Sequence, residues 1–119
     1  MPSLEELVKG SEELVRAIPS APDNAETYSA IIAELSVYSA MAATYTAGSK
    51  DTQTQKKLYG NIGIGYAMLA ERAKKDGNEM LQSYLTMLAN LYLKAAGAEK
   101  STAFDQSYSR EKNQYKKAA

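Results

Sequence analysis

The segment from Asn78 to Gly97 reads NEMLQSYLTMLANLYLKAAG. Its large apolar side chains recur every three or four positions, which is the spacing of one face of an α-helix. This predicted core face consists of Leu81, Tyr84, Leu85, Leu88, Leu91, Tyr92 and Ala95. Asn78 can cap the first amides of a helix, and Gly97 favours the left-handed conformation that ends one. We therefore predict a core helix between these two residues.

An amphipathic helix is predicted from Ser3 to Ile18, at the start of the chain. Ser3 and Glu6 form a capping box at its beginning, and Pro19 and Pro22 end it because each disfavours helix in the residue before. Its apolar residues are Leu4, Leu7, Val8, Leu14, Val15 and Ile18. Since this helix has its own cap and a proline-containing linker, we expect it to project or to dock partly on a neighbouring copy instead of completing its own bundle. The six apolar residues are then an assembly interface.

Two long helices are predicted between these segments. One begins at Asp23 as its cap and ends at Gly48, and the other follows residues 49–52 and ends near Gly77. The predicted buried stripe of the first comprises Ile31, Ile32, Leu35, Tyr38, Met41, Ala42 and Tyr45. That of the second comprises Leu58, Ile62, Ile64, Tyr66, Met68, Leu69 and Ala73. A last segment opens at Ser101 and places three aromatic residues on one side, namely Phe104, Tyr108 and Tyr115.

Three glycines lie inside the predicted helix that ends near Gly77, in the stretch GNIGIG at residues 60–65. Together they cost up to about 3 kcal/mol in helix propensity, so a compensating contact is required. We predict close helix packing at Gly60 and Gly63. A phosphate-binding loop is rejected, because the spacing matches neither common nucleotide motif and neither a preceding strand nor a following Lys-Ser/Thr is present.

The elements together predict an all-α fold. Turns of two to five residues favour antiparallel neighbours, so we expect an antiparallel four- to five-helix bundle with an N-terminal amphipathic helix on a Pro-containing linker. The 119 residues suffice for one domain, comprising the N-terminal helix and linker over residues 1–22 and the bundle over residues 23–119.

The composition excludes most catalytic classes. The chain has no cysteine and no histidine, so it lacks the usual nucleophile, general base and transition-metal ligands. Glu34 and Glu71 are the acids flanked by apolar residues deep in long helices, and we interpret them as surface or salt-bridging groups. The composition does not exclude catalysis by a lysine side chain, but no motif supports it. We expect no enzyme, no cofactor, no metal and no small-molecule substrate.

Hydropathy predicts no transmembrane segment, since no stretch approaches the roughly 20 apolar residues that span a bilayer. Residues 1–21 lack the basic start and apolar middle of a secretory signal. We therefore expect the chain to be made and kept inside a cell, at least until assembly.

Charge is distributed unevenly along the chain. Residues 1–48 hold seven acids and two bases, whereas residues 49–119 hold seven acids and twelve bases. Three interpretations stay open: neutralisation within one bundle, head-to-tail contact between copies, and non-specific DNA binding. The basic residues available for electrostatic or nucleic-acid contact are Lys56, Lys57, Lys74, Lys75, Arg110, Lys112, Lys116 and Lys117.

A tyrosine-rich, cysteine-free helical segment at residues 33–48 reads AELSVYSAMAATYTAG. In size, composition and helix layout the chain resembles the helical-bundle coat proteins of tailed spindle-shaped viruses of hyperthermophilic archaea. The resemblance implies a small capsid subunit that polymerises into the virion shell, encloses DNA and is assembled in the host cytoplasm. It implies no catalytic residues.

The leading hypothesis is therefore a non-enzymatic structural protein that self-associates through helix faces as a homo-oligomer or polymer, specifically a virion coat subunit. The alternative is a cytoplasmic helical adaptor or regulatory module that binds a partner protein helix in a groove.

Overall fold

Four α-helices make up most of the computed structural model, which describes residues 2–46 and 51–97. They are α1 (Leu4–Ala17), α2 (Ala25–Thr46), α3 (Thr52–Lys75) and α4 (Glu79–Ala95), with a 3-10 turn, η1, at Ile18–Ser20. No strand occurs within these two ranges, which confirms the all-α prediction for them. The predicted aromatic segment after Ser101 lies outside the described residues.

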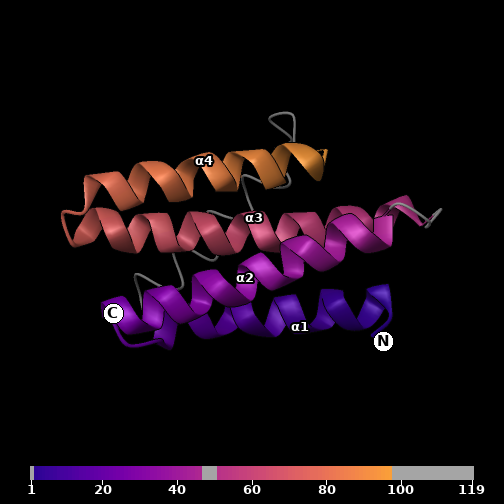
Figure 1. The fold of residues 1–119 in the computed structure, drawn as a ribbon, viewed down its shortest axis with the longest axis horizontal. Helices are drawn as coiled ribbons and strands as arrows, with labels where there is room; N and C mark the ends of the chain where they lie inside the picture. The colour runs from indigo at the N-terminus through magenta and orange to yellow at the C-terminus, as the bar shows by residue number, and fades with distance from the viewer. Residues whose placement is uncertain (1, 47–50, 98–119) are drawn as a thin grey trace.

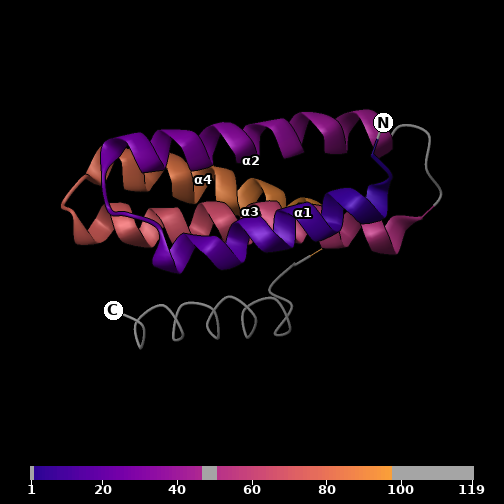
Figure 2. The same cartoon turned by 90° about the horizontal axis from the view of Figure 1, so that it is seen from below.

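The central helix is α3, and α1, α2 and α4 all pack on it. Figure 1 shows α4 turning back along α3 on the side away from α1. In Figure 2, which views the molecule from below, α2 forms a separate layer over α3 and α1. Every residue from Ile62 to Ala70 is buried, as expected of a helix with neighbours on several sides. Among the described helices, α4 packs almost entirely on α3.

Short polar side chains cap the helix starts. The Ser3 hydroxyl accepts from the Glu6 amide at 3.1 Å, and the Asn78 side chain accepts from the Leu81 amide at 3.1 Å. Both predicted caps are confirmed. The predicted cap of α2 is wrong, because Asn24 rather than Asp23 accepts a bond there, from the Thr27 amide at 2.8 Å.

Two of the three glycines of α3, Gly63 and Gly65, lie at helix contacts. A Cβ added at Gly63 would lie 2.8 Å from Leu93 Cγ and 3.0 Å from the Leu93 backbone nitrogen, so α3 and α4 meet closely there. This confirms the predicted close packing at Gly63. Gly60 is buried. The sequence did not distinguish Gly65, whose added Cβ would lie 2.9 Å from Leu35 Cδ2 and 3.4 Å from Val15 Cγ2.

The N-terminal helix packs in the core of its own chain, contrary to the prediction that it docks on a neighbour. Four of its six proposed interface residues are buried, and the other two pack against the same core at partial burial. The buried residues are Leu7, Val8, Val15 and Ile18, and the partly buried ones are Leu4 and Leu14. A hydrogen bond of 3.0 Å from the Asn61 side chain to the buried Ser11 hydroxyl also joins α1 to α3. The apolar face is thus occupied within one chain.

Arg72 fixes the linker between α1 and α2. Its buried guanidinium donates to the Ile18 carbonyl and to the Ala21 carbonyl, each at 2.6 Å, and lies 5.7 Å from the centre of the Tyr28 ring. These bonds satisfy carbonyls at a point where Pro19 interrupts the helical pattern. The proline-containing segment is therefore held against the end of α3.

Candidate interaction surface

The inner face of α4 is a conventional apolar contact with α3. Leu85 and Ala89 are buried there. Tyr92 stacks between two tyrosines of α3, with ring centres 6.2 Å from Tyr59 and 5.8 Å from Tyr66. Offset aromatic pairs at these distances add to the stability gained from burial. This face needs no further partner.

A second row of large apolar side chains lies on the outer side of α4, and we call it the α4 stripe. The fractional exposures are 86% for Met80, 50% for Tyr84, 60% for Met87 and 60% for Leu91. The four residues are separated by four, three and four positions, so they follow one side of the helix. Scattered exposed apolar residues are ordinary, but a contiguous row of large ones marks an interaction surface.

The sequence assigned two members of this stripe, Tyr84 and Leu91, to the core face, and the structure corrects that assignment. The apolar arc of α4 is wider than the part that α3 can cover. Because α4 has few contacts with α1 or α2, its remaining apolar side chains face outward. Ala95, also predicted for the core face, is exposed as well, whereas Leu85 is buried as predicted.

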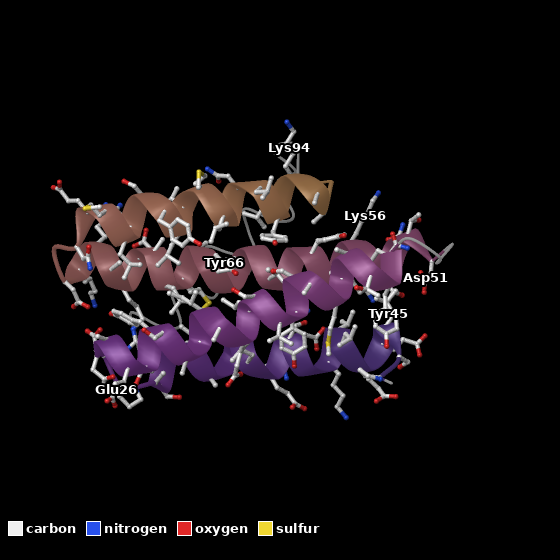
Figure 3. The ribbon with its side chains drawn as sticks, in the orientation of Figure 1. Glu26, Tyr45, Asp51, Lys56, Tyr66 and Lys94 are labelled. Carbon is white, nitrogen blue, oxygen red and sulfur yellow. The ribbon has the colours of Figure 1, made fainter. Side chains whose placement is uncertain are left out.

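Charged residues are confined to the two ends of α4. Glu79 opens the helix and Lys94 lies in its last turn, with no charged residue between them. Lys94 extends away from α3 in Figure 3. Each charge complements the helix dipole at its own end. The uncharged middle makes the α4 stripe inexpensive to remove from water.

A second exposed face with little charge lies on α2. Val37 is 53% exposed, and the neighbouring positions Ala30, Ala33 and Ala40 are exposed as well. We call these four residues the α2 outer face. The charged residues of α2 are Glu26 and Glu34 alone. Small side chains of this kind allow a neighbouring element to approach closely, but they provide less apolar surface than the α4 stripe.

A groove of about 390 Å³ runs between α1 and α2. Its lining consists of Pro2, Glu6, Leu7, Glu34, Val37, Tyr38 and Met41. Burial raises the pKa of the Tyr38 hydroxyl, and the carboxylates of Glu34 and Glu13 raise it further. The groove thus combines an apolar floor with acidic side chains at its rim.

A polar cluster joins the start of α2 to the end of α3. The Tyr28 hydroxyl shares its one proton between the Asp23 carboxylate and the Asp76 carboxylate, with the latter at 2.6 Å. This hydroxyl holds the pKa of Asp23 below its ordinary value of 3.8. Burial, reinforced by bonds to the two carboxylates, raises the pKa of Tyr28 above its ordinary value of 10.0. The contacts are internal to the fold, and we assign them a structural role.

Of the basic residues predicted for electrostatic contact, the four that the structure describes do not form one patch. Lys56 and Lys57 lie at the start of α3, while Lys74 and Lys75 lie at its end, roughly 27 Å away at the helical rise per residue. All four are exposed. Lys56, labelled in Figure 3, lies near the end of α4, with its Cε 3.5 Å from a Cβ added at Gly97. The other predicted residues, Arg110, Lys112, Lys116 and Lys117, fall outside the described part of the chain.

Comparison of the chain with protein-family models, with curated proteins and with solved structures finds no match. Within residues 2–46 and 51–97, no three acidic side chains come together as a metal ion would require. None of the helices described there has the length and apolar character needed to cross a membrane.

Proposed function

We propose that this chain is a non-enzymatic structural protein that associates with copies of itself. The observation that carries the proposal is the α4 stripe, in which four large apolar side chains are at least half exposed along one helix. Complete burial of such a side chain contributes about 1.5–3 kcal/mol, so a protein surface that covers the stripe gains substantially.

Self-association through α4 replaces the earlier hypothesis of assembly through the N-terminal helix. The apolar face of α1 is already used inside the chain, whereas the α4 stripe is not covered by the described residues. The α2 outer face is a second surface with little charge that a growing assembly could use. Two such surfaces on one subunit support a polymer as well as a dimer.

The virion coat subunit is the specific form of this proposal. An antiparallel helical bundle, with α1 held by its proline-containing linker, then forms the shell subunit and encloses DNA in the virion. Because the exposed lysines lie at opposite ends of α3, DNA contact relies on many copies acting together. The support for this form is the resemblance in size, composition and helix layout together with the exposed α4 stripe.

Light scattering of the full chain over a concentration series tests self-association. We expect an average mass above that of one chain, rising with concentration. Met87→Lys should weaken association by about 10-fold or more, because it removes the burial of one methionine from each copy and introduces a charge. Thr86→Lys is the matched control, since Thr86 is exposed on another side of the same helix. If the two variants weaken association equally, the α4 stripe is not the surface through which copies associate.

The alternative function is a cytoplasmic adaptor that binds an apolar helix of another protein. The groove between α1 and α2 favours it, because the Leu7, Val37 and Met41 side chains line an opening that accepts side chains of a helix. A mass equal to one chain at every concentration would favour the adaptor over the structural protein.

A further inference from the structure

We infer that two copies of this chain pair through their α4 helices in antiparallel orientation, around a two-fold axis near the middle of the α4 stripe. This inference rests on the proposed self-association and names its geometry. In the pair, Met80 of one copy lies opposite Leu91 of the other, and Tyr84 lies opposite Met87.

The spacing of the α4 stripe fits helix-to-helix packing. Steps of four, three and four residues follow the heptad pattern by which two helices interlock their side chains at a shallow crossing angle. The stripe covers roughly 16 Å of the roughly 25 Å length of α4. Contact therefore extends along most of the helix rather than at a single crossing point.

The stripe is also self-complementary. The steps of four, three and four read the same in both directions, with their centre between Tyr84 and Met87. A two-fold axis at that centre superposes the stripe of one copy on that of the other. Interfaces of this isologous kind require such a self-complementary patch. A second copy of α4 is thus a partner whose apolar side chains match the stripe position by position.

Charge selects the antiparallel orientation over the parallel one. Antiparallel pairing brings Glu79 of one copy towards Lys94 of the other at both ends of the contact. Parallel pairing brings two glutamates together at one end and two lysines at the other. Opposite charges at the edge of an apolar contact determine register and partner orientation. The two helix dipoles are also aligned favourably only in the antiparallel pair.

Disulfide trapping tests the geometry, because the natural chain has no cysteine and each introduced thiol is unique. Met80→Cys and Leu91→Cys are prepared separately and oxidised mildly, alone and as a mixture. In the antiparallel pair the mixture forms a linked heterodimer within minutes. Each variant alone remains unlinked, because its two thiols lie roughly 16 Å apart along the helix while a disulfide needs Cα atoms within about 7 Å.

Thr86→Cys is the control for random collision, since Thr86 is exposed but lies off the stripe. It should not form a linked species when mixed with either stripe variant. Circular dichroism of each reduced variant checks that the helices are intact. Both stripe positions are more than half exposed in one chain, so substitution there spares the core.

Charge reversal gives an independent measurement. Glu79→Lys alone and Lys94→Glu alone should each weaken the pair about five- to thirtyfold, because two end contacts change from attraction to repulsion. The double variant should regain most of the affinity. In a parallel pair each single reversal exchanges one like-charged contact for another and leaves the affinity unchanged.

The outcomes separate this inference from the proposed function. Rapid linkage in the mixture alone supports the antiparallel pair. Linkage of each variant with itself overturns the antiparallel geometry but not self-association. The same conclusion follows if no sample becomes linked while light scattering still shows assemblies. The stripe then packs elsewhere, for example on the α2 outer face. A mass of one chain throughout, without linkage, overturns both.

Discussion

Substitution of Gly63 by alanine should destabilise the fold although alanine is the better helix former. The added Cβ would lie 2.8 Å from Leu93 Cγ and 3.0 Å from the Leu93 backbone nitrogen. A side chain can rotate away, but a backbone atom moves only with α4 as a whole. Overpacking of this kind costs about 1–3 kcal/mol, and the gain in helix propensity offsets up to about 1 kcal/mol. With the full offset, the expected net loss is therefore up to about 2 kcal/mol.

Urea unfolding followed by far-ultraviolet circular dichroism measures this loss, and thermal unfolding should show a decrease of about 4–8 °C per kcal/mol. Gly65→Ala is the graded comparison, because its added Cβ meets the flexible side-chain ends of Leu35 and Val15 rather than backbone. Its net effect should be smaller. An increased unfolding midpoint for Gly63→Ala would refute the close contact between α3 and α4.

Three further results are expected for the N-terminal half and its attachment. Arg72→Met should lower the free energy of unfolding by about 2–4 kcal/mol in urea titrations, because two linker carbonyls lose the guanidinium as a donor. Lys74→Met, at an exposed position, should change it little. The pKa of Asp23 is lower in the folded chain than its unfolded value near 3.8, so its contribution to the free energy of unfolding is present above pH 3.8 and is lost as pH falls through the folded pKa. Tyr28→Phe should make stability depend less on pH in this range. An unchanged dependence of stability on acidic pH would exclude the hydrogen bond between Tyr28 and Asp23. Deletion of residues 1–20 should abolish cooperative thermal unfolding, since it removes a face of the core, and a truncated chain with an unchanged midpoint would contradict the packing of α1.

The sequence predicted the helices and several of their ends because those depend on local chemistry. Ser3 and Asn78 cap neighbouring amides, and Gly77 and Gly97 adopt the positive φ angles of 75° and 81° that end helices. Gly63 was predictable because glycines inside a helix need a compensating contact.

The sequence was less informative about which helices pack together and which side chains they bury. The apolar face of α1 had to be buried, but its pattern does not say whether the same chain or a neighbour buries it. Tyr84 and Leu91 look like core residues because hydrophobic spacing cannot tell how much of the arc α3 covers. Arg72 carries no local signal for its role, because its acceptors lie more than fifty residues earlier in the chain.

The candidate interaction surface was therefore identified from the exposure of its side chains in the structure and not from a sequence motif. The absence of catalytic residue types and the capped N-terminal helix led to the hypothesis of self-association through that helix, whose apolar face the structure buries in its own chain. The structure leaves the α4 stripe exposed. Of its four residues, periodicity had identified Tyr84 and Leu91 and had assigned both to the core. When the apolar arc of an amphipathic helix exceeds about a third of its circumference, one neighbouring helix is not enough to cover it.

Methionine oxidation in the unmodified chain tests whether the α4 stripe is buried between copies. Met80 and Met87 belong to the α4 stripe, while Met68 is buried in α3 and serves as an internal reference. Dilute hydrogen peroxide converts exposed methionine to its sulfoxide, and mass spectrometry of peptides gives the rate at each position. We expect Met80 and Met87 to oxidise rapidly at low protein concentration and to slow towards the rate of Met68 as the protein concentration rises. Rates at Met80 and Met87 that do not change with protein concentration would contradict burial of the α4 stripe between copies.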